Sequence, residues 1–257
     1  MHAFLLKAMV GALVGALVGL TGMGSGVLLL PILIFGVGIS PLFAIGSDAV
    51  FSALTKLGAG VLHWRQRTVD WKLVRFLALG SIPGASCGVL LLSYLRDVYG
   101  NGINDILRAV VGVLLVIIPL LLLFPGRSKK QIFRAVQLST RSCIGVSLIG
   151  LFAGFLVGMS SVGSGTVVLV LLVPLVESSP AILVGTDIVH AVILTGFTSL
   201  LYLRLGTIDF GLVIALLAGS IPGALLGVRL STSLPSRWLK RVLCVTLLIT
   251  GVRTLLV

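Results

Sequence analysis

The sequence predicts an all-α polytopic membrane protein made of two homologous halves, and two observations lead to this prediction. The first is composition: hydrophobic residues make up 58% of the 257 residues and charged residues only 10%. A soluble domain carries about a quarter charged residues, so this chain has too few polar residues to cover a water-soluble globule. The apolar residues gather in runs of about 20, the length at which a helix crosses a bilayer core about 30 Å thick.

The second observation is an internal repeat. A constant shift of 139 residues superimposes the two halves from about residue 11 to residue 90, and it places Asp48 on Asp187. The run Gly-Ser-Ile-Pro-Gly-Ala at 80–85 recurs complete at 219–224. Chance does not readily give so many matches in one register, even in a glycine-rich apolar chain. We therefore infer a gene duplication.

Each half is expected to contain an apolar run broken by glycine, followed by three transmembrane helices. The broken runs, 4–35 and 144–176, are each predicted to form a helical hairpin. The six spans are predicted at 42–62, 73–95, 106–124, 182–203, 210–230 and 239–256. The chain is thereby divided into an N-terminal repeat (1–125), a basic linker (126–141) and a C-terminal repeat (142–257).

The relative orientation of the halves depends on the broken runs. Four crossings per half give parallel repeats, whereas three crossings with a re-entrant hairpin give inverted repeats. Lys and Arg mark cytoplasmic loops, and in this chain they cluster at 65–75, 127–141 and 229–241. The inverted arrangement places all three clusters on one side, so we favour it, with the linker in the cytoplasm and both termini outside. Parallel repeats remain the alternative.

Charge and cysteine usage exclude several classes of protein. The formal net charge of +12 comes from these loop clusters rather than from a continuous basic stripe, so we expect no nucleic-acid partner. Cys87, Cys143 and Cys244 stand singly in apolar segments, which indicates neither a disulfide framework nor a zinc site. The sequence contains no metalloprotease motif and no nucleophile with a positioned base. We expect no catalytic residue, no metal, no cofactor and no enzyme activity.

The glycine-rich breaks form the first candidate site. Non-helical backbone at membrane depth is tolerated only where it is buried or lines a cavity. Helices resuming at Val27 and Thr166 would direct free N–H groups and positive dipole ends toward that cavity, an arrangement that suits an anion. The alternative is a close crossing of small residues, as Gly11 and Gly15 predict for the first helix. The predicted substrate-binding residues at the breaks are Thr21, Gly24, Ser25, Gly26, Ser160, Ser161, Gly163, Ser164 and Gly165.

The second candidate site consists of ionisable residues inside predicted spans, which are costly in a membrane and usually pair or face a water-filled path. Asp48 and Asp187 are equivalent in the repeat, and His190 follows Asp187 by one turn. We predict that these three residues couple transport to protons, since Asp187 and His190 share a helix face. Lys56 is predicted to neutralise Asp48 or to attract a substrate anion. The alternative is that both aspartates only lock the bundle together.

Several other motifs are assigned structural roles. The prolines of the two Ser-Ile-Pro-Gly-Ala runs lie inside predicted spans and indicate kinks or packing notches. Asp70 and Asp209 are predicted to cap the helices that follow them. Trp64 and Trp71 are predicted to anchor the chain at the membrane interface.

Four of these features together resemble one known family. They are the glycine-broken first helix of each half, the Gly-Ser-Asp and Gly-Thr-Asp segments that end at Asp48 and Asp187, the Arg-x-x-Thr-Val-Asp-Trp turn at 65–71, and the two Ser-Ile-Pro-Gly runs. With them the chain resembles the sulfite exporter TauE/SafE family of membrane permeases over nearly its whole length. The resemblance implies a multi-pass transporter in the plasma (inner) membrane of a bacterium or archaeon. It also implies export of sulfite, sulfoacetate or other organosulfonates with the help of the proton gradient.

Residues and resemblance together predict a secondary carrier with alternating access, in which the two broken helices meet near the midplane. Its expected partners are a small anionic substrate, protons as the coupling ion and the lipid bilayer, and a homodimer stays open. A passive anion channel is the alternative, because it would share an electropositive constriction and need no titrating carboxylate. A purely structural subunit would leave the duplicated polar breaks unexplained.

Overall fold

The computed structural model describes residues 2–21, 25–123, 140–173, 175–176, 178–231 and 236–256, and nearly all of them are helical, with no strand among them. The helices are α1 (His2–Thr21), α2 (Ser25–Pro31), α3 (Pro41–Arg65), α4 (Trp71–Tyr99), α5 (Ile103–Leu123), α6 (Thr140–Ser160), α7 (Thr166–Leu172), α8 (Pro180–Leu205), α9 (Phe210–Ser231) and α10 (Ser236–Leu256). A π-helical turn, Ile32–Gly36, extends α2, and a 3₁₀ turn, Gly100–Gly102, precedes α5. The predicted all-α class is confirmed.

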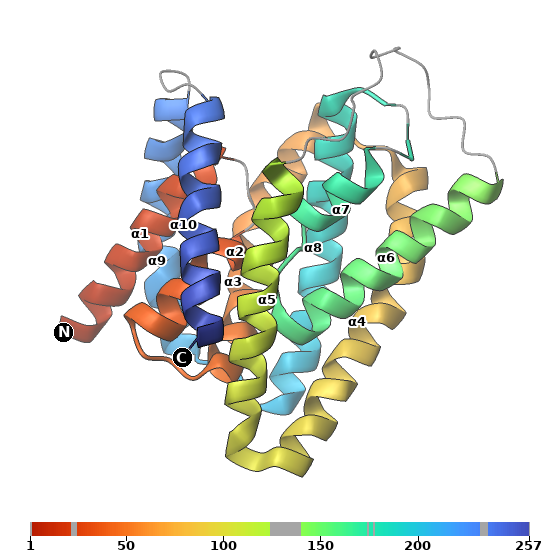
Figure 1. Cartoon of the computed structure of the whole chain (residues 1–257). Helices are drawn as coiled ribbons and strands as arrows, with labels where there is room; N and C mark the ends of the chain where they lie inside the picture. Colours follow the sequence, from red (N-terminus) through yellow and green to blue (C-terminus); the bar gives the residue numbers. More distant parts are fainter. Residues whose placement is uncertain are drawn as a thin grey trace.

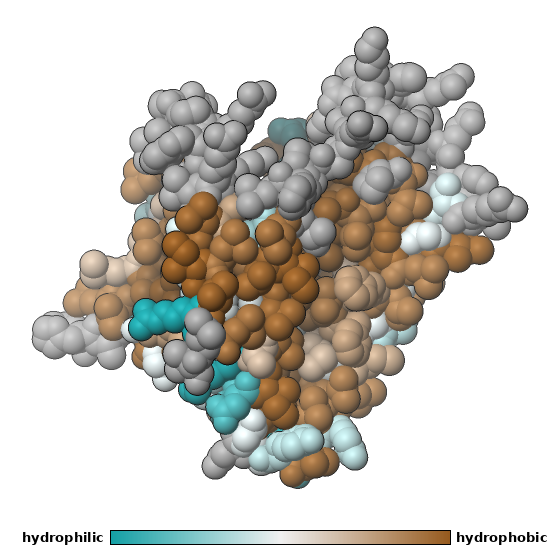
Figure 2. Space-filling model, in the orientation of Figure 1, coloured by the Kyte–Doolittle hydropathy of each residue, from teal (hydrophilic) through white to brown (hydrophobic). Residues whose placement is uncertain are grey.

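Five helices are long and apolar enough to cross a bilayer. Within the described ranges these candidate spans are Pro41–Arg65, Trp71–Tyr99, Ile103–Leu120, Ser142–Ser160 and Ala181–Leu205. Shorter apolar segments lie in α1, α2, α9 and α10. Hydrophobic side chains cover most of the visible face, and hydrophilic ones gather toward its lower end (Figure 2). Such a surface fits a multi-pass membrane protein, because lipid rather than water solvates it.

The glycine-rich first helix of each half packs against the other half. α1 lies along α9 on one side of the bundle, and α6 lies along α4 on the other (Figure 1). A Cβ atom added at Gly11 would lie 2.2 Å from Leu216 O, and one at Gly15 would lie 2.3 Å from Ser220 O. Gly150, the repeat equivalent of Gly11, approaches the backbone of α4 in the same way. Glycine permits backbones to come this close, and the close crossing predicted for the first helix is confirmed.

The two proline motifs lie at these crossings. Pro83 lies inside α4 and Pro222 inside α9. The glycine that follows each proline faces a neighbouring backbone. A Cβ atom at Gly84 would lie 2.2 Å from a carbonyl oxygen of α6, and one at Gly223 would lie 2.1 Å from a carbonyl oxygen of α1. The motifs are therefore packing notches, as predicted.

The equivalent helices α3 and α8 lie side by side and run in opposite directions. At one end, Asp209 N, just after α8, donates to Ser47 Oγ near the start of α3 over 3.0 Å. At the other end, Asp70 N, just after α3, donates to Thr186 Oγ1 near the start of α8 over 2.9 Å. The equivalent helices α5 and α10 also pack against each other in an antiparallel manner. Antiparallel courses of equivalent helices are the arrangement expected of inverted repeats.

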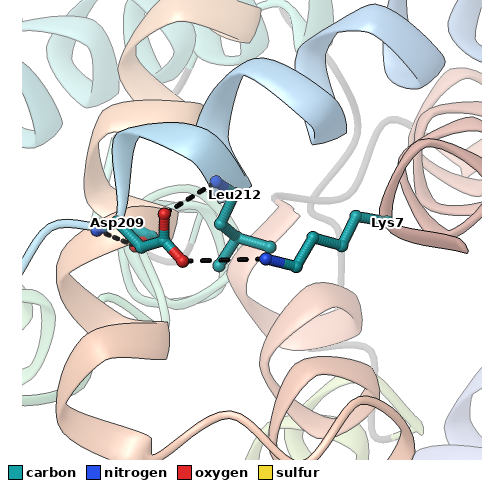
Figure 3. A network of polar contacts seen from close by, with 4 residues as sticks. Lys7, Asp209 and Leu212 are labelled. Carbon is teal, nitrogen blue, oxygen red and sulfur yellow. Dashed lines mark hydrogen bonds and ion pairs between the residues drawn. The ribbon is translucent and has the colours of Figure 1, made fainter. Parts of the chain in front are cut away.

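The aspartates predicted to cap helices do so. Asp70 Oδ1 accepts a hydrogen bond from Lys72 N over 2.9 Å at the start of α4. Asp209 Oδ1 accepts one from Leu212 N over 2.9 Å, and its Oδ2 lies 3.7 Å from Lys7 Nζ (Figure 3). Because Lys7 and Asp209 are partly exposed, this ion pair contributes about 0–1 kcal/mol. It nevertheless links the start of α1 to the start of α9.

The short helices α2 and α7, which follow the two breaks in the sequence, lie inside the bundle. α2 is buried along its whole length, and Leu29, Leu30 and Leu33 belong to the largest apolar cluster. α7 begins at Thr166, as predicted, and contributes buried residues to a second apolar cluster. α2 begins at Ser25 rather than at the predicted Val27. Ser25 and Gly26 thus form the first turn of a helix and are not part of the break.

Candidate functional site

The first polar group in the bundle surrounds Asp48 of α3, whose side chain is fully buried. Ser161 Oγ, from the segment between α6 and α7, donates to Asp48 Oδ2 over 2.8 Å. Ser25 Oγ donates to Asp48 Oδ1 over 3.4 Å and also contacts the hydroxyl of Ser52. Hydroxyls from both halves of the chain therefore satisfy this carboxylate. A buried carboxylate needs such donors, because leaving it unpaired costs several kcal/mol.

Lys56 lies two turns further along α3 and contacts the second break. Its Nζ donates to Ser164 Oγ over 2.6 Å and to Ser164 O over 3.2 Å. Lys56 is half-buried, whereas Ser164 is buried. Among the described residues the ion pairs are Lys7 with Asp209 and Asp105 with Arg108, so Lys56 forms no ion pair with Asp48 within 4.0 Å. It holds a hydroxyl and a carbonyl instead.

The second carboxylate, Asp187 of α8, has a different environment from its repeat equivalent. It is buried, and its Oδ1 has no hydrogen-bond partner. Its Oδ2 faces Gly165, at which a Cβ atom would lie 3.4 Å away. His190, also buried, shares its Nε2 with Ser81 Oγ of α4 at 2.8 Å, while its Nδ1 has no partner. No hydrogen bond joins Asp187 to His190 in the described structure.

The repeat explains why the two carboxylates differ. Ser52 beside Asp48 is replaced by Ala191 in the second half. The hydroxyl donor Ser161 corresponds to a glycine at position 22 in the first half. Ser164, the counterpart of Ser25, is occupied by Lys56. The duplicated frame therefore keeps both carboxylates but leaves one of them without its donors.

Five of the predicted break residues lie at the polar contacts of the site. Ser25, Ser161 and Ser164 take part in the polar contacts described above. Gly26 and Gly165 allow the backbone to approach the carboxylates, and a Cβ atom at Gly26 would lie 2.7 Å from Ser161 O and 2.8 Å from Asp48 Oδ2.

The remaining predicted residues do not join the cluster or are not described. Ser160 Oγ donates to Leu156 O within its own helix over 2.8 Å. Gly163 has a φ of +100° and provides the left-handed turn of the second break. Gly24 lies outside the described residues. Thr21 is described only as the last residue of α1.

Three polar residues of this region were not among the predicted site residues. Ser52 contacts Ser25, Ser81 contacts His190, and Tyr202 donates its hydroxyl to Gly158 O over 2.6 Å. Ser81 stands in the repeated Ser-Ile-Pro-Gly run, and this recurrence was the available signal. Ser52 and Tyr202 have no polar counterpart of the same type in the other half, so the repeat gave no indication of either.

The site combines one cation, several neutral hydroxyl donors and two buried carboxylates. Lys56 supplies one positive charge, and the serine hydroxyls supply neutral donors to oxyanion oxygens. Asp187 Oδ1, a carboxylate oxygen, and His190 Nδ1, a ring nitrogen, are buried without a hydrogen-bond partner. Among the described residues no group of three His, Cys, Asp or Glu side chains could hold a metal ion.

Comparison with known proteins places this architecture among membrane transporters. The family model described as Sulfite exporter TauE/SafE matches residues 7–254. The chain is 36% identical over 253 residues to the probable membrane transporter protein YjnA of Bacillus subtilis (strain 168), covering 97% of each. It is 28% identical over 159 residues to the probable sulfite/organosulfonate exporter TauE of Cupriavidus necator, covering 61% of this chain and 56% of the relative. No solved structure matches the chain.

Proposed function

This chain belongs to the sulfite exporter TauE/SafE family of membrane transporters, and from this premise we propose that it exports sulfur-containing anions as a proton-coupled secondary carrier. The proposed substrates are sulfite, sulfoacetate or other organosulfonates, and the proposed location is the plasma membrane of a bacterium or archaeon. One relative of this chain, from Cupriavidus necator, is named a probable sulfite/organosulfonate exporter.

The contact between Lys56 and Ser164 carries the proposal for anion binding. Lys56 Nζ lies 2.6 Å from Ser164 Oγ, at the break before α7. An ammonium group held by a hydroxyl and a carbonyl, rather than by a carboxylate, can exchange these neutral partners for the oxygens of an anion. Its hydrogen bonds to an anion would be charge-assisted and therefore stronger than the bonds they replace. Ser25 and Ser161 would supply further donors if Asp48 were protonated, since they now donate to its carboxylate.

Asp187 and His190 are the better placed of the predicted proton carriers. Asp187 Oδ1 is buried without a partner, so a proton can bind it without breaking an existing hydrogen bond, and His190 lies one turn away with its Nδ1 also unpartnered. Asp48, by contrast, accepts hydrogen bonds from Ser25 and Ser161. We therefore assign the main coupling role to Asp187 with His190, and we assign Asp48 a supporting role that includes holding the start of α2 next to the second break.

Alternating access is proposed to arise from two inverted halves. The antiparallel courses of α3 with α8 and of α5 with α10 support this relation. In Figure 1 the turn between α3 and α4, the end of α5 and the start of α10 lie toward the same end of the bundle. The three basic clusters adjoin these ends in the sequence, which supports a cytoplasmic location for all three. Carriers with inverted repeats bind substrate at the interface of the repeats and alternate access around it.

A binding panel tests the proposed substrate class. Purified protein is titrated with sulfite, sulfate, sulfoacetate, taurine, lactate and chloride by calorimetry and by thermal shift. We expect saturable binding of a sulfur oxyanion, and we expect Lys56→Met to abolish it while the protein remains folded. Lys72→Met is the matched control, because it removes the same charge from an exposed position at the start of α4. Absence of binding across the panel, or unchanged binding in Lys56→Met, would contradict the site.

A further inference from the structure

The turn between α3 and α4 forms a second site with a chemistry of its own. A cavity of about 610 Å³ lies there, lined by Trp64, Arg65, Arg67, Val69 and Trp71. We call this set of five residues the interfacial cup. It lies at the end of two candidate membrane spans, and Asp70 N of the same turn donates to Thr186 Oγ1, next to Asp187. The proposed transport mechanism uses none of its residues.

The two arginines of the interfacial cup have no ion-pair partner among the described residues. Arg65 and Arg67 are exposed, and neither is within 4.0 Å of a carboxylate among the described residues. Trp64 and Trp71 are 60% and 46% exposed. Two guanidinium groups and two indoles that line one cavity offer planar donors for a phosphate together with apolar faces for the adjoining glycerol and acyl carbons.

The equivalent turn of the second half forms without the two tryptophans and Arg67, so the fold does not require these residues. The equivalent turn in the second half has Leu203 in place of Trp64, Gly206 in place of Arg67 and a phenylalanine in place of Trp71. The equivalent position has a left-handed backbone in both turns, with φ of +66° at Gly206 and +55° at Arg67. Glycine adopts this conformation readily, whereas a residue with a side chain adopts it at a cost. Arg67 thus occupies a position at which the backbone conformation favours glycine. Backbone strain of this kind is often found at functional sites.

A second cavity begins at the same turn. It has a volume of about 710 Å³ and lies between α4 and α6. Lys72, adjacent in sequence to the interfacial cup, lines it, and the remaining lining is mostly apolar, including Phe76, Leu79 and Leu148. A groove with a cation in its lining and apolar walls suits an acyl chain below an anionic headgroup.

From these observations we propose that the interfacial cup binds the phosphate headgroup of an anionic phospholipid at the cytoplasmic face of the membrane. The positive-inside rule places this basic turn in the cytoplasm, where anionic lipids give the leaflet a negative surface potential. The proposal is independent of which anion the protein transports. The bound lipid would contact the α3–α4 turn from the membrane side of the bundle.

The experiment compares lipid binding by the full-length protein and two variants. Arg67→Gly installs the residue of the equivalent turn, so it removes one charge while relieving the left-handed strain, and it folds at least as stably as the original chain. Arg75→Gln removes the same charge from the exposed face of α4 without altering the lining of the cup. Each protein is titrated with phosphatidylglycerol or phosphatidylcholine in detergent, and bound lipid is measured by native mass spectrometry and by the shift in melting temperature.

We expect the original chain and Arg75→Gln to prefer phosphatidylglycerol over phosphatidylcholine, and Arg67→Gly to bind phosphatidylglycerol about fivefold more weakly. Inorganic phosphate, added alone, is expected to give no comparable rise in melting temperature. Three results would overturn the proposal: no lipid preference in the original chain, equal weakening in both variants, or full stabilisation by inorganic phosphate. The last result would make the cup a site for a free anion.

Discussion

Replacing Asp187 by asparagine should separate proton coupling from the stability of the protein. Asp187 Oδ1 accepts no hydrogen bond, so Asp187→Asn removes a charge without breaking a contact to that atom. Because a buried carboxylate without donors is destabilising, we expect Asp187→Asn to be at least as stable as the original chain. The matched variant Asp48→Asn behaves differently, because Ser161 Oγ donates to Asp48 Oδ2 over 2.8 Å. A bond to a charged group contributes about 1.5–3 kcal/mol and a neutral bond about 0.5–1.5 kcal/mol, so Asp48→Asn should cost about 1–2 kcal/mol.

The coupling itself has a defined magnitude. A difference of one pH unit across the membrane is equivalent to about 1.4 kcal/mol per proton, which supports about tenfold accumulation of an anion moved with one proton. In proteoliposomes with such a gradient, the original chain should reach about tenfold accumulation. Asp187→Asn should equilibrate the anion without accumulating it. Exchange of labelled for unlabelled substrate should survive in this variant, because Lys56 and Ser164 remain in place.

The outcome that refutes this reasoning is equally specific. If Asp187→Asn still accumulates the anion about tenfold, Asp187 does not carry the coupled proton. If Asp48→Asn loses accumulation while its melting temperature stays unchanged, the roles assigned to the two carboxylates are reversed. His190→Gln provides a further comparison, since it keeps a hydrogen-bonding group near Ser81 and removes the imidazole. Gradient-driven accumulation should fall in that variant as well.

Three further changes test the geometry of the bundle. Gly26→Ala should lower stability by about 1–3 kcal/mol, because its Cβ would lie 2.7 Å from Ser161 O, whereas Gly165→Ala, with its nearest atom 3.4 Å away, should melt within a few degrees of the original chain. Tyr202→Phe removes the hydroxyl that donates to a carbonyl of α6 over 2.6 Å and should cost about 1 kcal/mol in thermal unfolding. A cysteine introduced as Pro235→Cys should react with an impermeant thiol reagent from the cytoplasmic side, and reaction from outside alone would favour parallel repeats.

Much of the helical framework could be predicted from local sequence. The spans follow from apolar runs, and the bounds of α3, α4, α8 and α9 lie within a few residues of the prediction. Asp70 and Asp209 were recognisable as caps because a capping side chain bonds N–H groups only two or three residues away. The close crossing at Gly11 was visible because small residues spaced by four form one stripe on a helix.

The contacts of the candidate site could not be predicted in the same way. Ser161 and Asp48 are 113 residues apart, and Lys56 and Ser164 are 108 apart, so their pairing depends on how α3 passes the break between α6 and α7. The sequence suggested that Lys56 neutralises Asp48 or attracts an anion. In the structure Lys56 Nζ donates to Ser164 instead of forming an ion pair with Asp48. The difference between the two aspartates depends on single replacements such as Ala191 for Ser52, whose effect appears only once the donors are placed around each carboxylate.

The central claim, that this chain is a carrier and not a channel, is tested most directly by counterflow. Proteoliposomes are loaded with unlabelled sulfite or sulfoacetate and diluted into a trace of the same labelled anion without a pH gradient. A carrier predicts transient accumulation of label above the outside concentration, because the unlabelled anion leaving returns the binding site to the outside. A simple approach of label to equilibrium, with no overshoot and no dependence on internal substrate, would contradict the account and favour a passive anion channel.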